Sequence, residues 1–165
     1  MAIKLMARQI IEVDQKDLLK KLTTAFADEW SAYYQYWLGA QIAKGVMRGV
    51  VVAELIEHAN EELGHAQMIT NRIIQLGGTV TMLPSEWSKF AGCKYNAVKS
   101  ENSLTILQEN IKGEQCAIKF YDSLLKELHC KDFVTANMIS KILEDEVKHE
   151  QDLVTILEDL SVCCK

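Results

Sequence analysis

Apolar side chains recur every three or four residues along four long stretches of the chain, the spacing of helices that turn one face to a core. The alternation of apolar and polar residues that is typical of strands is nearly absent. The stretches predict four long helices, at about 15–44, 47–76, 101–129 and 132–162. We therefore expect one all-α domain over residues 1–165, a four-helix bundle made of two antiparallel hairpins.

The segment 77–100 is too long for a tight turn between two helices, and it contains a Gly-Gly pair and the single proline, Pro84. We predict that it is the crossover between the hairpins, with a short helix at 85–90. The turns within the hairpins are expected near Gly45, which can end a helix, and just before Asp132, which can cap the next one.

A glutamate interrupts each apolar stripe: Glu29, Glu62, Glu114 and Glu146. Burying a lone carboxylate costs several kcal/mol of desolvation, so four that converge in one core need positive partners. No Lys or Arg occupies the stripes, and cations from solution are the simplest remaining source. Two divalent ions would neutralise the four carboxylates.

His65 and His149 each follow one of these glutamates by three residues, which places the carboxylate and the imidazole on one helix face. The other histidines, His58 and His129, lack this pairing. The two halves of the chain also match, since 33 residues separate Glu29 from Glu62 and 32 separate Glu114 from Glu146. Because residues equidistant from a hairpin turn lie at one height, we predict a single two-metal site. Its ligands are Glu29, Glu62, His65, Glu114, Glu146 and His149, a set that suits Fe(II) and, almost equally, manganese.

The net charge and the cysteine count indicate which partners and which compartment to expect. The net charge of −5 and the thin basic arm of Lys4 and Arg8 do not favour DNA binding. We expect no membrane helix and no signal peptide, and hence a cytoplasmic protein. Five cysteines, an odd number, fit a reducing compartment better than a disulfide framework.

The six candidate ligands, with Tyr36 two turns beyond Glu29, resemble those of bacterioferritin and its relatives over nearly the whole chain. The resemblance implies that Glu62 and Glu146 bridge two irons, that the other two glutamates are terminal ligands, and that each histidine caps one iron. Bacterioferritin has a haem-binding methionine directly after the second-helix glutamate. Leu63 stands there in this chain, so we do not expect haem. Tyr36 is either a core residue or a source of electrons.

Only five residues follow Leu160, whereas the relatives that form 24-subunit cages carry a short fifth helix. The chain therefore more closely resembles the Dps-like ferritins called thioferritins, which implies a twelve-subunit cage. The same resemblance implies a cysteine pair near the metals, Cys93 and Cys116, as candidate redox thiols. Cys116 lies about 200° round the helix from Glu114 and so need not face the metals. The alternative is that it is a small residue of the core or of an interface. For Cys130, Cys163 and Cys164 no role is expected.

The resemblance implies a ferroxidase that oxidises Fe(II) with peroxide or O₂ and stores ferric mineral in its cage, protecting against oxidative stress. Two other enzymes share such a centre, manganese catalase and a rubrerythrin-type peroxidase. The electron-transfer module of rubrerythrin needs Cys-x-x-Cys pairs, which this sequence lacks. A structural or DNA-packing helical assembly is the alternative without catalysis, and it leaves the buried glutamates unexplained.

Overall fold

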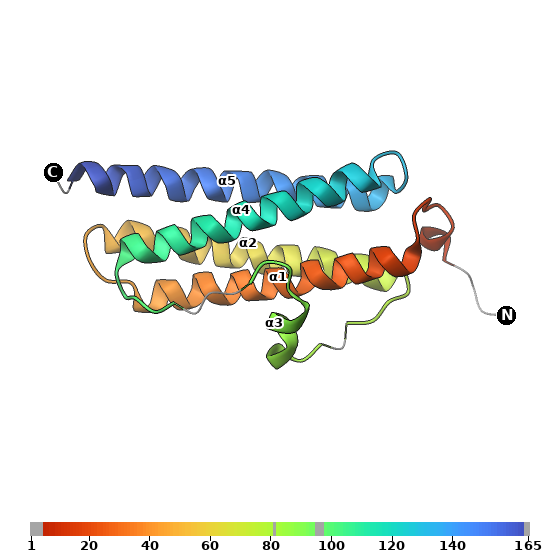
Figure 1. Ribbon diagram of the computed structural model, residues 1–165, viewed down its shortest axis with the longest axis horizontal. Helices are drawn as coiled ribbons and strands as arrows, with labels where there is room; N and C mark the ends of the chain where they lie inside the picture. Colours follow the sequence, from red (N-terminus) through yellow and green to blue (C-terminus); the bar gives the residue numbers. More distant parts are fainter. Residues whose placement is uncertain (1–4, 81, 95–97, 164–165) are drawn as a thin grey trace.

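The computed structural model of the protein describes residues 5–80, 82–94 and 98–163, and four long helices dominate it (Figure 1). They are α1 (Gln15–Ile42), α2 (Arg48–Gln75), α4 (Ser103–Leu128) and α5 (Phe133–Cys163). The described residues contain no strand. The four helices predicted from the apolar pattern are confirmed to within two residues at each end. Among the described residues, no helix combines the length and apolar character that crossing a membrane requires.

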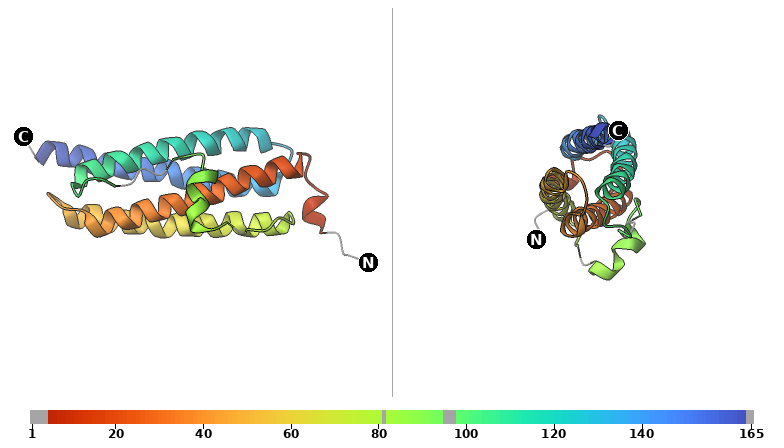
Figure 2. Two further views of the ribbon diagram at one scale, coloured as in Figure 1. Left: turned by 60° about the horizontal axis from the view of Figure 1, so that its bottom comes forward. Right: turned by 90° about the vertical axis from the view of Figure 1, so that its left-hand side faces the viewer.

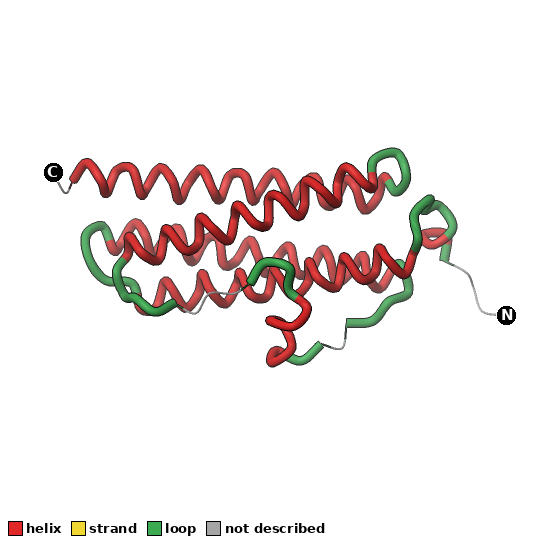
Figure 3. Tube along the Cα trace, in the orientation of Figure 1, coloured by secondary structure: helices red, strands yellow, loops and turns green. Residues whose placement is uncertain are grey.

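The long helices pair into two hairpins, α1 with α2 and α4 with α5, and the hairpins lie against each other as a bundle (Figure 2). The crossover begins at the end of α2 and returns along the bundle to the start of α4 (Figure 3). It carries the turn η2 (Pro84–Glu86) and the short helix α3 (Trp87–Phe90), which confirms the short helix predicted there. A further turn, η1 (Met6–Arg8), precedes α1. The absence of a fifth bundle helix stays a prediction, because α5 continues to the last described residue.

Both hairpin turns lie where the sequence places them. In the first, α1 already ends at Ile42, and Gly45 (φ 112°) adopts a positive φ in the loop rather than at the helix end. In the second, the carboxylate of Asp132 accepts a hydrogen bond of 3.0 Å from the backbone N–H of Thr135. Asp132 therefore caps α5 as predicted.

The apolar core has two parts, one toward each end of the bundle. One is built around Leu22, Ile73, Leu128 and Ile142, the other around Ala40, Leu55, Leu107 and Leu153. The four stripe glutamates fall between these parts in every helix. Apolar packing on both sides thus excludes water from the middle of the bundle, where the polar residues gather.

Candidate metal centre

The structure brings all six predicted residues together at the middle of the bundle, each no more than 3% exposed. They form two overlapping groups whose ligand atoms lie within 4.8 Å of one another. One group is Glu29, Glu62, His65 and Glu146, and the other is Glu62, Glu114, Glu146 and His149. Glu62 and Glu146 belong to both groups, so the site consists of two half-sites with two shared carboxylates.

The shared glutamates each direct one oxygen to either half-site. Oε2 of Glu62 is 3.3 Å from Nδ1 of His65, and its Oε1 is 3.3 Å from Nδ1 of His149. For Glu146 the corresponding distances are 3.4 Å from Oε1 to His65 and 3.7 Å from Oε2 to His149. A carboxylate whose two oxygens face different half-sites has the arrangement of a bridge.

The other two glutamates each approach one histidine. Oε2 of Glu29 is 3.3 Å from Nδ1 of His65, and Oε2 of Glu114 is 3.9 Å from Nδ1 of His149. Each half-site therefore offers one imidazole nitrogen, one carboxylate of its own and a share of two more, an O-rich set that suits iron and manganese.

Without metal, this cluster favours bound protons. Burial, and then the charge of neighbouring glutamates, raises the pKa of Glu29 and Glu114 well above the ordinary value. Burial alone would lower the pKa of His149, but the nearby carboxylates of Glu146 and Glu62 outweigh burial and raise the pKa to about 10. The pKa of His65 is raised in the same way. Protons thus supply positive charge that four buried carboxylates require.

Several polar atoms that face the centre have no hydrogen-bond partner within the described residues: Oε2 of Glu29, Oε1 of Glu62, Oε2 of Glu114, Oε1 of Glu146 and Nδ1 of His149. Buried polar atoms are nearly always paired, and leaving one unpaired costs about 1–3 kcal/mol. A pair of divalent cations would take such unpaired oxygens and nitrogen as ligands. The residues present therefore fit a two-metal site.

Two tyrosines hold the outer glutamates, each from the opposite hairpin. The hydroxyl of Tyr36 donates to Glu114, and the hydroxyl of Tyr121 donates to Glu29. Sequence reasoning singled out Tyr36 but not Tyr121. The signal was available, since Tyr121 follows Glu114 by seven residues just as Tyr36 follows Glu29.

Acidic residues also orient the histidines from outside the centre. Nε2 of His65 lies 3.1 Å from Oδ2 of Asp145, and Nε2 of His149 lies 2.7 Å from Oε2 of Glu61. These contacts hold each ring with Nδ1 toward the centre, as outer carboxylates do for metal-ligating histidines. Sequence reasoning missed both residues, although each directly precedes the glutamate of a Glu-x-x-His motif.

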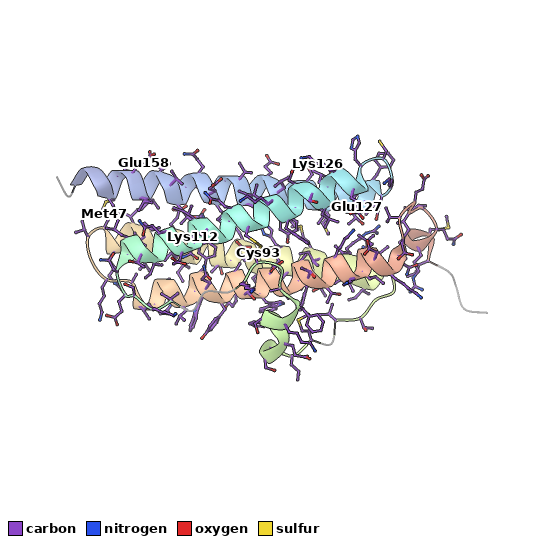
Figure 4. The ribbon with its side chains drawn as sticks, in the orientation of Figure 1. Met47, Cys93, Lys112, Lys126, Glu127 and Glu158 are labelled. Atoms are coloured by element: carbon purple, nitrogen blue, oxygen red, sulfur yellow. A yellow bond between two sulfur atoms is a disulfide. The ribbon has the colours of Figure 1, made fainter. Side chains whose placement is uncertain are left out.

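Cys93 of the crossover and Cys116 of α4 form a disulfide, with their Cα atoms 5.8 Å apart. Figure 4 shows Cys93 midway along the bundle, where the crossover passes over the helices. The crossover therefore brings the two cysteines that the resemblance pairs into bonding distance. Cys130 is free and exposed. The side chain of Cys163 and all of Cys164 lie outside the described residues.

The disulfide lies beside a cavity of about 50 Å³ that reaches the centre. Its walls include Cys93, Glu29, Glu62 and Glu146. Asp28 also lines it and accepts a hydrogen bond of 2.8 Å from the backbone N–H of Cys93. The cavity leaves room for a small molecule beside both shared glutamates.

Comparisons with known proteins agree with this architecture. The ferritin-like domain family matches residues 19–162. The DNA protection during starvation protein of Pyrococcus furiosus is 30% identical over 148 residues, which cover 87% of this chain and 80% of that protein. A solved structure, the bacterioferritin-related dodecameric thioferritin of Bacteroides fragilis, is 39% identical with a TM-score of 0.93, covering 96% of this chain and 95% of that one. A ferritin-like, diiron-carboxylate protein of Bacillus anthracis is 25% identical with a TM-score of 0.73, covering 89% and 99%. The chain therefore belongs to the ferritin-like family, and within it resembles a bacterioferritin-related thioferritin.

Proposed function

We propose that the protein is a ferroxidase that oxidises Fe(II) at the six-residue centre and stores the product as ferric mineral inside a cage. The observation that carries this is the pair of half-sites sharing Glu62 and Glu146. With peroxide as oxidant, two Fe(II) each give up one electron, and one H₂O₂ takes both electrons and two protons to become two waters. Each turnover then removes free Fe(II) and peroxide together, which protects against oxidative stress.

The position of each residue in the site determines its role in the proposed reaction. Glu62 and Glu146 hold both substrate ions, Glu29 and Glu114 hold one each, and the histidines cap the two ends of the site. Tyr36 and Tyr121 keep the outer glutamates in place by hydrogen bonds. Tyr36 is also our candidate for supplying electrons, because it touches the centre through Glu114.

Rapid mixing of metal-free protein with Fe(II) and then peroxide tests the proposal. We expect a fast phase in which two Fe(II) per subunit are oxidised for each peroxide consumed. Manganese catalase, the main enzymatic alternative, uses a similar ligand set. It predicts manganese in the natively purified protein and release of O₂ from peroxide without added iron.

A structural or DNA-packing assembly predicts no fast phase at all. The name of the Pyrococcus furiosus relative states DNA protection, but it refers to that protein. Here the unpaired atoms around the centre favour a metal site over a packing role alone.

Metal loading should release protons, because two divalent ions replace the protons that now balance the glutamates. We expect a net release of protons, from Glu29 and Glu114 and from the two histidines, because the pKa of each of these groups is raised in the metal-free site. All four groups have raised pKa values, so lowering the pH must weaken metal binding. Titration with Fe(II) under argon, in weakly buffered indicator dye, measures the release. Metal affinity that does not change between pH 6 and 8 would contradict it.

The native particle should be a closed shell of twelve subunits. Twelve chains of 18.7 kDa give a mass of roughly 220 kDa. The similar thioferritin of Bacteroides fragilis is described as dodecameric, and a closed shell would confine the mineral. Light scattering or native mass spectrometry of the purified protein checks this, and a monomer or a 24-subunit particle would refute it.

The Cys93–Cys116 disulfide should open with reductant and re-form with peroxide. Two thiols and one H₂O₂ then give one disulfide and two waters. Differential alkylation with peptide mapping, before and after peroxide, follows both cysteines. Cys130, which is free and exposed, is the internal control and should be alkylated after reduction. Two thiols that stay reduced while peroxide is consumed at the metal site would show that the pair has no part in the redox chemistry.

A further inference from the structure

His58 is a fully buried histidine on α2 that lacks a glutamate three residues before it, and sequence reasoning therefore set it aside. Its ring stacks on that of His149, with 4.1 Å between centroids and 23° between planes. Neither ring nitrogen has a hydrogen-bond partner within the described residues. A buried imidazole with both nitrogens unpaired requires an explanation.

The ring is directed at two carboxylates outside the six-residue centre. Nε2 of His58 is 3.1 Å from Oε1 of Glu54 and 4.0 Å from Oδ2 of Asp152. Glu54 lies one turn earlier on α2, and Asp152 comes from α5. The ligand atoms of the three residues lie within 4.8 Å of one another. The nitrogen and the Glu54 oxygen are close without the geometry of a hydrogen bond, an arrangement expected for two ligands of one cation.

The charges around this cluster also favour a cation. Burial, and then repulsion from Asp152, raises the pKa of Glu54 above its ordinary value. The side chains of Glu54 and Asp152 are 24% and 35% exposed, so ions from solution have access. Lys148 lies beside the cluster, with Nζ 4.0 Å from Oδ2 of Asp152, and it is itself 54% exposed. An exposed ammonium at that distance can swing away when a metal arrives.

The cluster is also connected to the centre. Glu61 forms a close group with His58 and His149, and it contacts Nε2 of His149 at 2.7 Å. Carboxylates therefore continue from the surface between α2 and α5 to the ring of a candidate metal ligand.

We propose that Glu54, His58 and Asp152 form a third divalent-cation site, which Fe(II) occupies on its way to the six-residue centre. Two carboxylates and one imidazole leave coordination positions for water, so the site binds more weakly than the centre and can release its ion. The binding claim stands on this cluster alone, whereas delivery to the centre rests on the proposed ferroxidase function.

Binding is tested with Co(II) and the intact assembly under argon, since Co(II) uses the same ligands and does not oxidise there. Calorimetric titration should show three ions per subunit, two tight and one weaker. Asp152→Asn and Glu54→Gln should each weaken the third ion about tenfold or more and keep the other two. The matched control is Asp159→Asn, seven residues along α5 and exposed, which should keep all three. Anomalous diffraction from Co(II)-soaked crystals should place a peak between Glu54, His58 and Asp152.

The double variant Glu62→Ala/Glu146→Ala separates the two proposals. It should lose the two tight ions and keep the third. Two ions in the natural protein, or a third ion unaffected by Asp152→Asn, overturns the third site and leaves the ferroxidase proposal intact. A single ion that is lost with Asp152→Asn supports the third site and counts against the two-metal centre.

Delivery is tested at one Fe(II) per subunit, where the rate depends on capture of the ion. Asp152→Asn should slow oxidation about tenfold, while Asp159→Asn oxidises iron at the natural rate. Loss of the third Co(II) site without slower oxidation would refute the delivery role.

Discussion

Replacing Glu62 and Glu146 together by alanine is expected to abolish the rapid oxidation of Fe(II) while the bundle stays folded. Each of these carboxylates faces both histidines, so their loss would remove the two candidate ligands that the half-sites share. We expect the initial rate to fall by more than about a hundredfold. Removing a residue that only hydrogen-bonds to a metal ligand typically costs about 10–100-fold, and removing the ligands themselves should cost more. The fold should survive, since removing two of four crowded acids relieves electrostatic repulsion.

Stopped-flow oxidation of Fe(II), with circular dichroism to check helix content, measures this effect. The matched control is Glu57→Ala/Glu144→Ala, which removes two exposed glutamates from the same two helices. It should oxidise Fe(II) at the natural rate. A folded Glu62→Ala/Glu146→Ala protein with unchanged initial rates would eliminate the two-metal assignment.

Arg72→Met is expected to destabilise the protein by about 3–5 kcal/mol, the cost of breaking a buried ion pair from one side. Arg72 is 3% exposed near the end of α2, and its guanidinium lies 2.8 Å from the carboxylate of Asp132, which is 1% exposed. Its Nε also donates a 2.6 Å hydrogen bond to Thr135. Without the cation, Asp132 would be a buried charge held only by the start of α5.

Denaturant unfolding at equal subunit concentration tests this, because assembly makes stability depend on concentration. Arg48→Met is the control, since Arg48 is exposed at the other end of the same helix. It should cost far less. If both variants lost the same free energy of unfolding, burial of the Arg72–Asp132 ion pair would not contribute to stability as proposed. Fe(II) oxidation by the folded Arg72→Met protein should be retained, because Arg72 is not among the residues of the centre.

The long helices and the set of six central residues were accessible from sequence because both depend on local regularities. An apolar residue every three or four positions marks a helix wherever it packs, and Glu62 with His65 share a face in any helix. Matched distances from the two turns then place Glu29 level with Glu62 and Glu114 level with Glu146. The crossover was equally evident from its length and its glycines.

Contacts between the hairpins were decided only by the tertiary structure, because they depend on how the hairpins are rotated and offset against each other. In that geometry the hydroxyl of Tyr121 donates a hydrogen bond to Glu29, and Arg72 forms a buried ion pair with Asp132. It also stacks His58 on His149 and directs it at Asp152, three residues further along α5. The path of the crossover over the bundle likewise brings Cys93 to Cys116. The spacing of residues within one helix carries no information about which side chains of another helix they meet. Sequence reasoning therefore identified the candidate ligands of the centre but missed Tyr121, Asp145 and Glu61, which contact them.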